Sequence, residues 1–473
     1  MSKSHVLAVT PPLCQELYDM IIDAVAANKS VADLAACKSA GRVFVHSARK
    51  YLHGGIRLRA HTDLQALDTL FTPDRLLTYV RQVAFCGCQT KDFSDRHDCP
   101  LFSSAMYRPD YTWIIHVLPY LHRFKGIRCL ELCDLSWGDI PREAREFILS
   151  NFPSVIHLSL RAVDFWTSRE LIRTLQAFPN LSILYTCAIS CYRPNHTTSQ
   201  VTSTAPLKID QLVLHGVRNM RYIPLIYWVL GHRTSVDIAH VGILWDDLNF
   251  VYLVELMRKL APSLVTLHLE KRGFLPDWYL LSRQQARVGP DAFSQSIVEL
   301  RRRQATPIDV DESHQGVMQT LTFVPPDAGV ERALSLLAER PILGSGLRRL
   351  AATLFWNSFT EAAFILKLLS QIVGDQTSWV YLHIYVRPSW HSMPWSSVDD
   401  CVAEIGENVS HAEGKKFTLV VERLQPFESQ PWDADIIRSC FEKTSKLVTD
   451  INIVTNTSRF TPTANPSQKR KLQ

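Results

Sequence analysis

The chain has 473 residues, of which 46% are hydrophobic and 21% are charged, and its net charge is +5. This composition is typical of a folded protein with a large core, and it excludes a chain that is disordered over most of its length. The length exceeds that of an ordinary single domain, which favours a fold built from repeated units. The positive charge is not gathered into a long basic run, so we expect no nucleic-acid partner.

The N-terminal residues and the cysteines predict a cytoplasmic or nuclear protein. Residues 1–12 are too short and too polar for a signal peptide. The longest apolar run, near Ile223 to Leu230, is much shorter than the roughly 20 residues that a membrane-spanning helix needs. The 11 cysteines form no tight disulfide framework, and we expect them to be reduced. We therefore expect no membrane partner.

After the tail of residues 1–12, residues 13–58 predict three short helices and a first strand. Apolar residues recur at helical spacing in the first helix. These positions are Leu13, Leu17, Met20, Ile21, Ala24 and Val25. Gly54 and Gly55 predict the end of the third helix, because glycine readily adopts the left-handed conformation that ends helices. The segment from Ile56 to Leu58 alternates apolar and arginine residues, which predicts a half-buried strand.

Residues 59–455 repeat an apolar strand pattern followed by a helical pattern. The strand patterns that start at Ile127, Val155, Leu181 and Ile209 are about 26–28 residues apart, within the roughly 20–29 residues of leucine-rich repeats. Further strand patterns lie at residues 80–85, 236–238, 264–269, 321–323, 347–350, 381–384, 417–421 and 451–453.

Helix signals separate these strands, and irregular segments interrupt them. Thr167 and Glu170 have the spacing of a capping box, which predicts the start of a helix. The repeat spacing is lost near residues 86–110 and 273–319, which we interpret as insertions, and residues 456–473 have the composition of a disordered tail.

These patterns predict an α/β fold in which a short three-helix module precedes an irregular, leucine-rich-repeat-like solenoid. The strands of such a solenoid form a curved parallel sheet, and the helices lie outside it. One strand–helix unit cannot bury its apolar face alone, so stacked units share a continuous core. The product is an extended surface that suits recognition of another macromolecule and needs no catalytic residue.

The N-terminal residues resemble an F-box, the adaptor-binding motif of cullin-type ubiquitin ligases. Leu13–Leu17 (LCQEL) is similar to the family's Leu-Pro-x-Glu-Leu/Ile start, and Ile21 and Ile22 follow at the family's spacing. Cys37–Phe44 (CKSAGRVF) is similar to its Cys-x-x-Val-Cys-x-x-Trp segment.

Two repeat units extend the resemblance over most of the chain. Phe152–Leu160 (FPSVIHLSL) and Phe178–Leu184 (FPNLSIL) look like repeats of the fungal F-box proteins that carry degenerate leucine-rich repeats. The resemblance implies a substrate-recognition subunit of an SCF-type (cullin-RING) ubiquitin ligase. Its F-box would bind a Skp-type adaptor, and through it a cullin, while the repeat surface binds an unknown target protein. It implies neither a catalytic residue nor a cofactor, and we expect a monomer outside the complex.

The resemblance also implies which side chains contact the adaptor. By position these are Leu13, Leu17, Ile21, Ile22, Leu34, Val43 and Phe44. Each large apolar side chain that becomes fully buried contributes roughly 1.5–3 kcal/mol, so a few of them can dominate an interface. The alternative interpretation of the same apolar stripes is a helical cap that closes the first repeat.

Two departures from the family pattern favour another function. Cys14 stands where the family usually has proline, and Phe44 stands where it usually has tryptophan. Both are compatible with a non-catalytic leucine-rich-repeat interaction scaffold whose F-box has decayed. A third alternative is an enzyme whose site lies in the insertions. Since the chain has no phosphate-binding loop, nucleophile elbow or zinc-protease motif, we expect no enzymatic activity.

Two groups of residues could have further roles. Cys86, Cys88, His97 and Cys99 form the only cluster of residue types that bind metals, but their Cys-x-Cys spacing is tighter than the usual gap of about two to four residues in zinc sites. We interpret the cysteines as reduced thiols at a strand end, next to a loop, and expect no metal. Aromatic residues gather late in the chain. These are Trp379, Tyr381, Tyr385, Trp390 and Trp395. We expect most of them in the core and one or two exposed as partner anchors.

Overall fold

A computed structural model gives the fold of the chain. It describes residues 15–27, 31–72, 76–87, 110–193, 209–217, 223–231, 237–245, 250–271, 326–342, 345–356, 359–386, 395–409, 415–423, 434–447 and 450–454. The chain divides into two compact units, Met1–Ile209 and Asp210–Gln473, and each unit is described by itself. Within the described residues, no helix is both long enough and apolar enough to cross a membrane.

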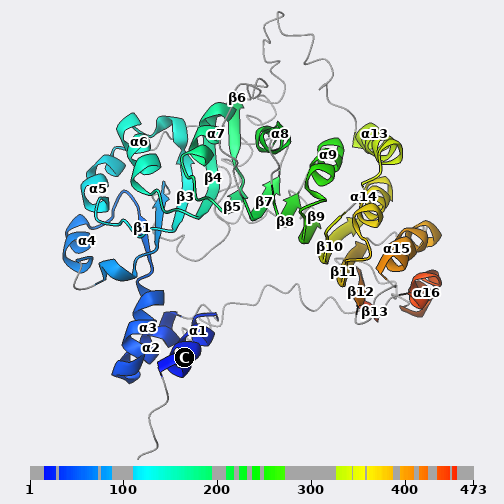
Figure 1. Cartoon of the computed structure of the whole chain (residues 1–473), viewed down its shortest axis with the longest axis horizontal. Coiled ribbons are helices and arrows are strands. Elements are labelled where there is room, and N and C mark those ends of the chain that lie inside the picture. Colours follow the sequence, from blue (N-terminus) through cyan, green and yellow to red (C-terminus); the bar gives the residue numbers. More distant parts are fainter. Residues whose placement is uncertain are drawn as a thin grey trace, which may run out of the picture. The chain divides into compact units, whose positions relative to one another are not determined.

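The first unit begins with the three expected helices, which pack against one another (Figure 1). They are α1 (Gln15–Ala27), α2 (Val31–Ala40) and α3 (Arg42–Leu52). Ile22, Leu34 and Ala48, one from each helix, are buried and form the centre of a small core. Val25, Ala26, Cys37, Phe44 and Leu52 pack around them. Because each helix contributes one buried residue and its neighbours, the module has a core of its own.

The end of α3 shows why Gly54 is required, and the reason differs from the one expected. Gly54 does not have the left-handed backbone conformation. Instead, a Cβ atom at this position would lie 2.4 Å from the Lys50 carbonyl oxygen, closer than any real contact. The Gly54 carbonyl then accepts hydrogen bonds from the backbone N–H groups of Arg81 and Gln82, at 2.8 and 3.0 Å. The absence of a side chain therefore lets the backbone turn close to Lys50 at the end of α3. The chain then continues into β1 while the Gly54 carbonyl is hydrogen-bonded to the start of β2.

The rest of the first unit alternates strands and helices. Its strands are β1 (Gly55–Leu58), β2 (Gln82–Cys86), β3 (Cys129–Ser136), β4 (His157–Thr167), β5 (Ile183–Cys187) and β6 (Ser190–Arg193). Its further helices are α4 (Leu64–Leu70), η1 (Leu77–Tyr79), α5 (Trp113–Leu121), η2 (Trp137–Asp139), α6 (Arg142–Asn151) and α7 (Ser168–Gln176). β1 to β5 pair in chain order, all parallel, and β6 pairs with β4.

A kink recurs at the same level of neighbouring strands. Asp134, Ala162 and Ala188 have φ angles of 52°, 51° and 53°, in the left-handed region that few non-glycine residues adopt. In the pairing of β3 with β4, residues on both sides of Asp134 and Ala162 are register partners. The kink moves the most deeply buried hydrophobic positions from even to odd residue numbers. Before it these are Leu130, Leu132, Leu158, Leu160 and Leu184, and after it they are Leu135, Val163, Phe165 and Ile189.

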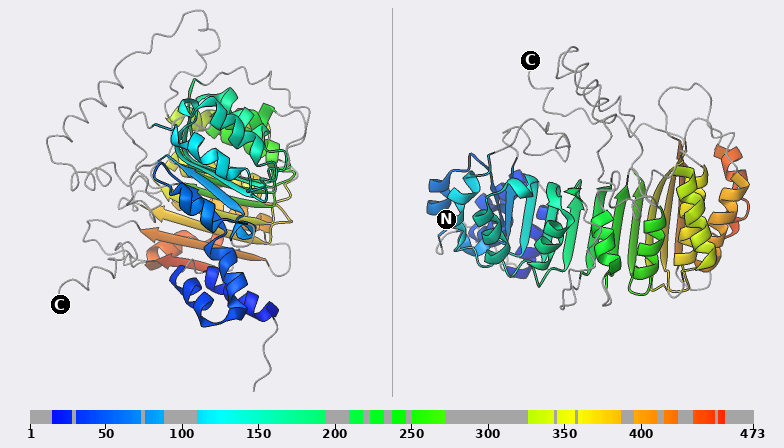
Figure 2. Two further views of the ribbon diagram at one scale, coloured as in Figure 1. Left: turned by 90° about the vertical axis from the view of Figure 1, so that its left-hand side faces the viewer. Right: turned by 90° about the horizontal axis from the view of Figure 1, so that it is seen from above.

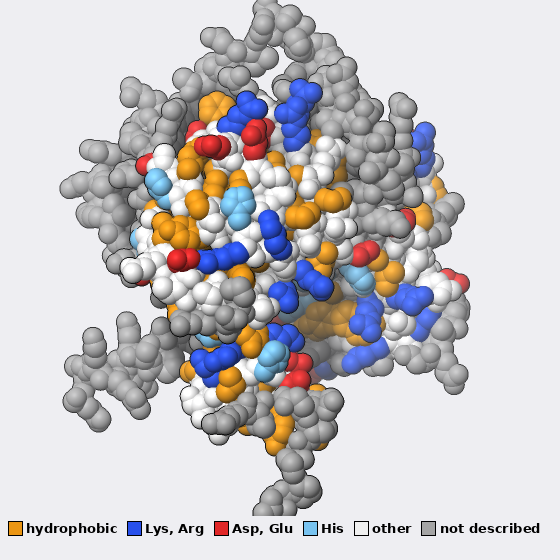
Figure 3. Space-filling view, turned by 60° about the vertical axis from the view of Figure 1, so that its left-hand side comes forward, with side chains coloured by type: hydrophobic (Ala, Val, Ile, Leu, Met, Phe, Trp, Pro, Cys, Tyr) orange, Lys and Arg blue, Asp and Glu red, His pale blue; other side chains and the backbone are white. Residues whose placement is uncertain are grey.

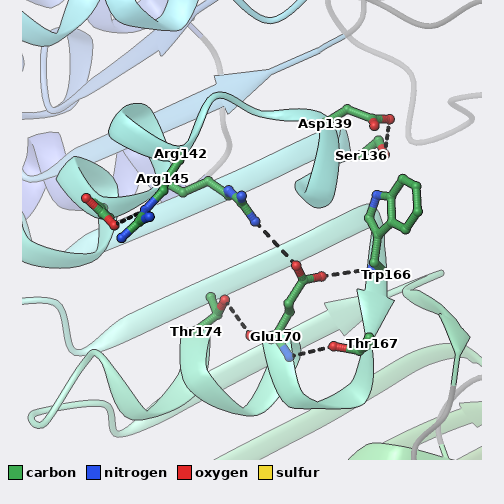
Figure 4. Close-up of polar contacts among 9 residues, drawn as sticks. Ser136, Asp139, Arg142, Arg145, Trp166, Thr167, Glu170 and Thr174 are labelled. Atoms are coloured by element: carbon green, nitrogen blue, oxygen red, sulfur yellow. Dashed lines mark hydrogen bonds and ion pairs between the residues drawn. The ribbon is translucent and has the colours of Figure 1, made fainter.

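The expected helix start at Thr167 is confirmed (Figure 4). The Thr167 hydroxyl accepts a hydrogen bond from the Glu170 backbone N–H at 3.2 Å. The Glu170 carboxylate accepts one from the backbone N–H of Trp166, at 3.0 Å, and pairs with Arg145 of α6 at 3.3 Å. The cap therefore ties α7 both to the end of β4 and to the preceding helix.

The second unit follows the same alternation. Its strands are β7 (Gln211–Val217), β8 (His240–Trp245), β9 (Thr266–Lys271), β10 (Arg349–Trp356), β11 (Trp379–Val386), β12 (Lys416–Arg423) and β13 (Asp450–Val454). Its helices are α8 (Ile223–Gly231), α9 (Phe250–Leu260), α13 (Pro326–Glu339), α14 (Phe359–Ile372), α15 (Trp395–Val409), α16 (Ala434–Cys440) and η7 (Thr444–Lys446). The strands pair in chain order and all are parallel.

The α/β class and the open parallel sheet are thus confirmed, and in each unit the helices that connect the strands lie along one side of them (Figure 2). One expected strand lies elsewhere, because the structure has β8 at His240–Trp245 rather than at residues 236–238. The strand expected at residues 321–323, the insertion at 273–319 and the tail at 456–473 lie outside the described residues. Most of the insertion expected at 86–110 also lies outside them.

Candidate functional site

Helix α1 is apolar on two opposite sides. One side carries Ile22, which is completely buried in the core of the module. The other side carries Leu17, Met20 and Ile21, which are 42%, 65% and 43% exposed. The spacing of three and four residues between these exposed side chains places them on one face of the helix. A helix that is apolar on a solvent-facing side is expected to have a partner. We call Leu17, Met20 and Ile21 the α1 stripe.

The surface of the three-helix module carries hydrophobic side chains, in the lower part of Figure 3. Phe44 from α3 is half-buried, and its ring meets the Tyr18 ring of α1 edge-on with the centroids 5.1 Å apart. Phe44 also packs against the core centred on Ile22. Phe44 therefore fixes α3 against α1 and has only part of its surface available to a partner.

Polar contacts fix α1 relative to α3 next to the α1 stripe. The Tyr51 hydroxyl donates a hydrogen bond to the Asp23 carboxylate at 2.5 Å, and the Ser47 hydroxyl donates one to Asp19. The hydrogen bond to Asp23 raises the pKa of Tyr51 to about 12. The Lys50 ammonium lies 5.1 Å from the centre of the Tyr51 ring. These contacts hold the exposed side of α1 in one orientation, as a preorganised docking surface requires.

Of the seven expected adaptor contacts, Phe44 is half-buried, and the structure sorts the other six into different groups. Leu17 and Ile21 are exposed and lie together in the α1 stripe. Ile22 and Leu34 are buried in the core of the module, so we reassign them from adaptor contacts to core residues. Leu13 lies outside the described residues, as does the side chain of Val43.

Met20 is the most exposed residue of the α1 stripe, and it was absent from the expected contact set. Its position three residues after Leu17 and one before Ile21 was the signal in the sequence that placed it on the same side. Methionine suits a docking surface because its unbranched side chain adapts to irregular partner surfaces.

The module joins the first strands through α3 rather than through the α1 stripe. The His46 imidazole Nδ1 lies 3.1 Å from the Tyr79 hydroxyl, and the two ring centroids are 5.3 Å apart. Val80, which precedes β2, and Val83 within β2 are fully covered, whereas Leu17 and Ile21 are exposed. The α1 stripe therefore does not cap the sheet.

Of the four candidate metal ligands, Cys86 is the one that lies in the part of the chain that the structure describes. Cys86 at the end of β2 is buried and is the register partner of Cys133 on β3. A hydrogen bond with Cys86 and burial raise the pKa of Cys133, so this thiol stays protonated. Its Sγ donates to Glu131, which also pairs with Arg161 at 3.2 Å. No described group of three or more potential ligands could hold a metal ion. Cys88, His97 and Cys99 lie outside the described residues.

Neither a family model nor a curated protein sequence matches the chain. The fold defines an α/β protein of stacked strand–helix units that begins with a three-helix module. The α1 stripe is an exposed apolar surface of that module.

Proposed function

We propose that the chain is a substrate-recognition subunit of an SCF-type ubiquitin ligase, and that α1–α3 form an F-box-like module that binds a Skp-type adaptor. The observation that carries this proposal is the exposure of Leu17, Met20 and Ile21 on a helix whose other side fills the core of the module. The adaptor would cover the α1 stripe.

The size of the α1 stripe is sufficient for a specific contact. Full burial of a large apolar side chain contributes roughly 1.5–3 kcal/mol, and these three side chains retain about half of their surface for a partner. Burial of the stripe would then contribute about 3 kcal/mol, which is roughly a hundredfold in affinity. The remaining affinity would come from neighbouring side chains, including the exposed part of Phe44.

The strand–helix units support the second half of the proposal. Their strands pair in chain order and their helices lie on one side, which is the arrangement expected of a leucine-rich-repeat-like scaffold. Such a scaffold would hold a target protein close to a ubiquitin-carrying enzyme and raise its effective concentration there. The chain itself would catalyse no reaction.

The test is co-purification of the full chain with a Skp-type adaptor. We expect the unmodified chain to retain the adaptor and the Leu17→Asp/Ile21→Asp variant to lose it. The matched control is Ile436→Asp on α16, since Ile436 is an isoleucine exposed to a similar extent, 49%, on a different helix. Retention of the adaptor by the double variant would overturn the proposal.

An alternative function is an interaction scaffold whose F-box no longer binds an adaptor. The observation that favours it is the position of Phe44, which is half-buried against Tyr18 and the core of the module. A scaffold of this kind would remain folded and monomeric, and would retain no adaptor in the same experiment.

A further inference from the structure

A row of aromatic side chains lies on the side of β11 that faces away from the helices. Burial alternates along this strand, with Val380, Leu382, Ile384 and Val386 completely buried on the helix side. Trp379, Tyr381, His383 and Tyr385 occupy the other side and are partly exposed. We call these four residues the aromatic row. We expected most of the late aromatic residues in the core, but of the four that the structure describes Trp395 alone is buried, and Trp379, Tyr381 and Tyr385 are partly exposed.

The rings of the aromatic row are held by one another and by Glu422. The Trp379 and Tyr381 rings are nearly parallel, with an interplanar angle of 8° and centroids 6.0 Å apart. The His383 and Tyr385 ring centroids are 4.1 Å apart. The Nε2 atom of His383 lies 3.0 Å from the Glu422 carboxylate on β12. The row is therefore ordered before any partner arrives, which reduces the entropic cost of binding.

The neighbouring strands place small side chains beside the aromatic row. Ala351 on β10 and Thr418 on β12 are the register partners of Tyr381. Thr353 and Val420 are the register partners of His383. All four side chains are smaller than the aromatic rings between them.

Two cations lie at one end of the aromatic row. Arg349 on β10 and Lys416 on β12 are the register partners of Trp379, and both are exposed. Within the described part of the chain, neither side chain forms an ion pair. The unpaired guanidinium and ammonium groups lie on either side of the indole ring. This arrangement complements a peptide segment in which an acidic residue is next to an apolar residue.

We propose that this face of β10–β12 binds an extended acidic segment of a partner protein. The carboxylates of the segment lie between Arg349 and Lys416, and its apolar side chains lie along the aromatic row. Aromatic side chains and arginine are favoured as binding anchors, and this face supplies both. The assignment of this partner as the target of a ubiquitin ligase rests on the proposed function, but the binding itself does not.

Charge on the same face favours a peptide over a single-stranded nucleic acid. Stacked aromatic rings and cations also occur in nucleic-acid grooves, but those grooves carry positive charge along their length. Here Glu422 lies beside His383, and Glu270 on β9 is the register partner of Thr353. These carboxylates would repel a phosphate backbone, whereas a peptide can place its acidic residues at one end only.

The binding is tested by fluorescence anisotropy of the full chain with three labelled probes. The first is a pool of short peptides with adjacent Asp or Glu residues followed by Leu, Phe or Tyr. The second pool has Lys in place of the acidic residues, and the third probe is oligodeoxythymidine. We expect the acidic pool to bind about tenfold more tightly than the Lys pool, with an affinity that falls as salt is added. Equal or tighter binding of the Lys pool or of oligodeoxythymidine, or no binding of the acidic pool, would overturn the inference.

Variants locate the site. Arg349→Glu/Lys416→Glu is expected to weaken binding of the acidic pool about tenfold and to abolish its advantage over the Lys pool. Tyr381→Ser is expected to weaken the acidic pool without changing its salt dependence. The matched control is Arg332→Glu, an exposed arginine on α13, which should leave the affinity unchanged. Unchanged binding by the double variant contradicts the inference. Adaptor co-purification is measured on the same variants, so that loss of adaptor binding and loss of peptide binding can be told apart.

Discussion

Leu17 and Ile22 lie on opposite sides of α1, five residues apart in the sequence, and the first is 42% exposed while the second is completely buried. One short helix therefore has two apolar sides with different roles. The side with Ile22 holds α1 to α2 and α3, and the side with Leu17 is available to a partner. The same arrangement predicts opposite consequences for substitutions on the two sides.

Truncation of the buried side is expected to destabilise the module. Ile22→Ala removes a completely buried side chain and should lower the free energy of unfolding by about 2–5 kcal/mol. Met20→Ala, on the exposed side of the same helix, should change it by less than about 0.5 kcal/mol. Urea denaturation of the full chain, followed by helical circular dichroism, measures both. Similar losses for the two variants would show that the burial of α1 has been assigned incorrectly.

The recurrent kink predicts that glycine stabilises one position and destabilises another. Ala162 has a left-handed φ of 51°, a conformation that costs alanine about 1–2 kcal/mol. Ala162→Gly removes that cost, but the greater freedom of glycine stabilises the unfolded chain by roughly 0.4–1 kcal/mol. The free energy of unfolding is therefore expected to rise by about 0.5 kcal/mol. Ala333→Gly in the middle of α13 should instead lose about 1 kcal/mol. Thermal unfolding compares the two, and a loss of stability in both would contradict the kink.

The contact between α3 and α1 predicts a change of stability at alkaline pH. A hydrogen bond to Asp23 raises the pKa of Tyr51 to about 12, so the folded state holds this proton more tightly than the unfolded state. The stabilisation is fully present below pH 10, the ordinary tyrosine pKa, and is lost as the pH rises from about 10 to about 12. Denaturant midpoints measured over this range should fall more for the unmodified chain than for Tyr51→Phe. The same fall in both would exclude this role for Tyr51.

The repeated alternation of strands and helices could be predicted because its period is visible in the sequence. The buried residues that follow the kink could not be predicted. Strand patterns assume that every second residue is buried, and the left-handed conformation of Ala162 resets this count, so Val163 and Phe165 follow Leu158 and Leu160 into the core. No feature of alanine itself signals such a conformation.

The candidate site was predictable in part for a related reason. Leu17, Ile21 and Ile22 all lie in apolar positions of one helix, and periodicity alone cannot tell which of two apolar sides meets the core. Packing against Leu34 and Ala48 decides this in favour of Ile22. The sequence resemblance named contacts on all three helices, and the three-dimensional structure was needed to show that Leu17 and Ile21 are exposed whereas Ile22 is buried.

The central claim is that the α1 stripe binds a Skp-type adaptor, and calorimetric titration of the adaptor into the full chain tests it most directly. We expect saturable binding to the unmodified chain and at least roughly hundredfold weaker binding to Leu17→Asp/Ile21→Asp, since burial of the stripe contributes about 3 kcal/mol. The Ile436→Asp control should bind as the unmodified chain does. No heat of binding with the unmodified chain, or equal affinity for the double variant, would contradict the account.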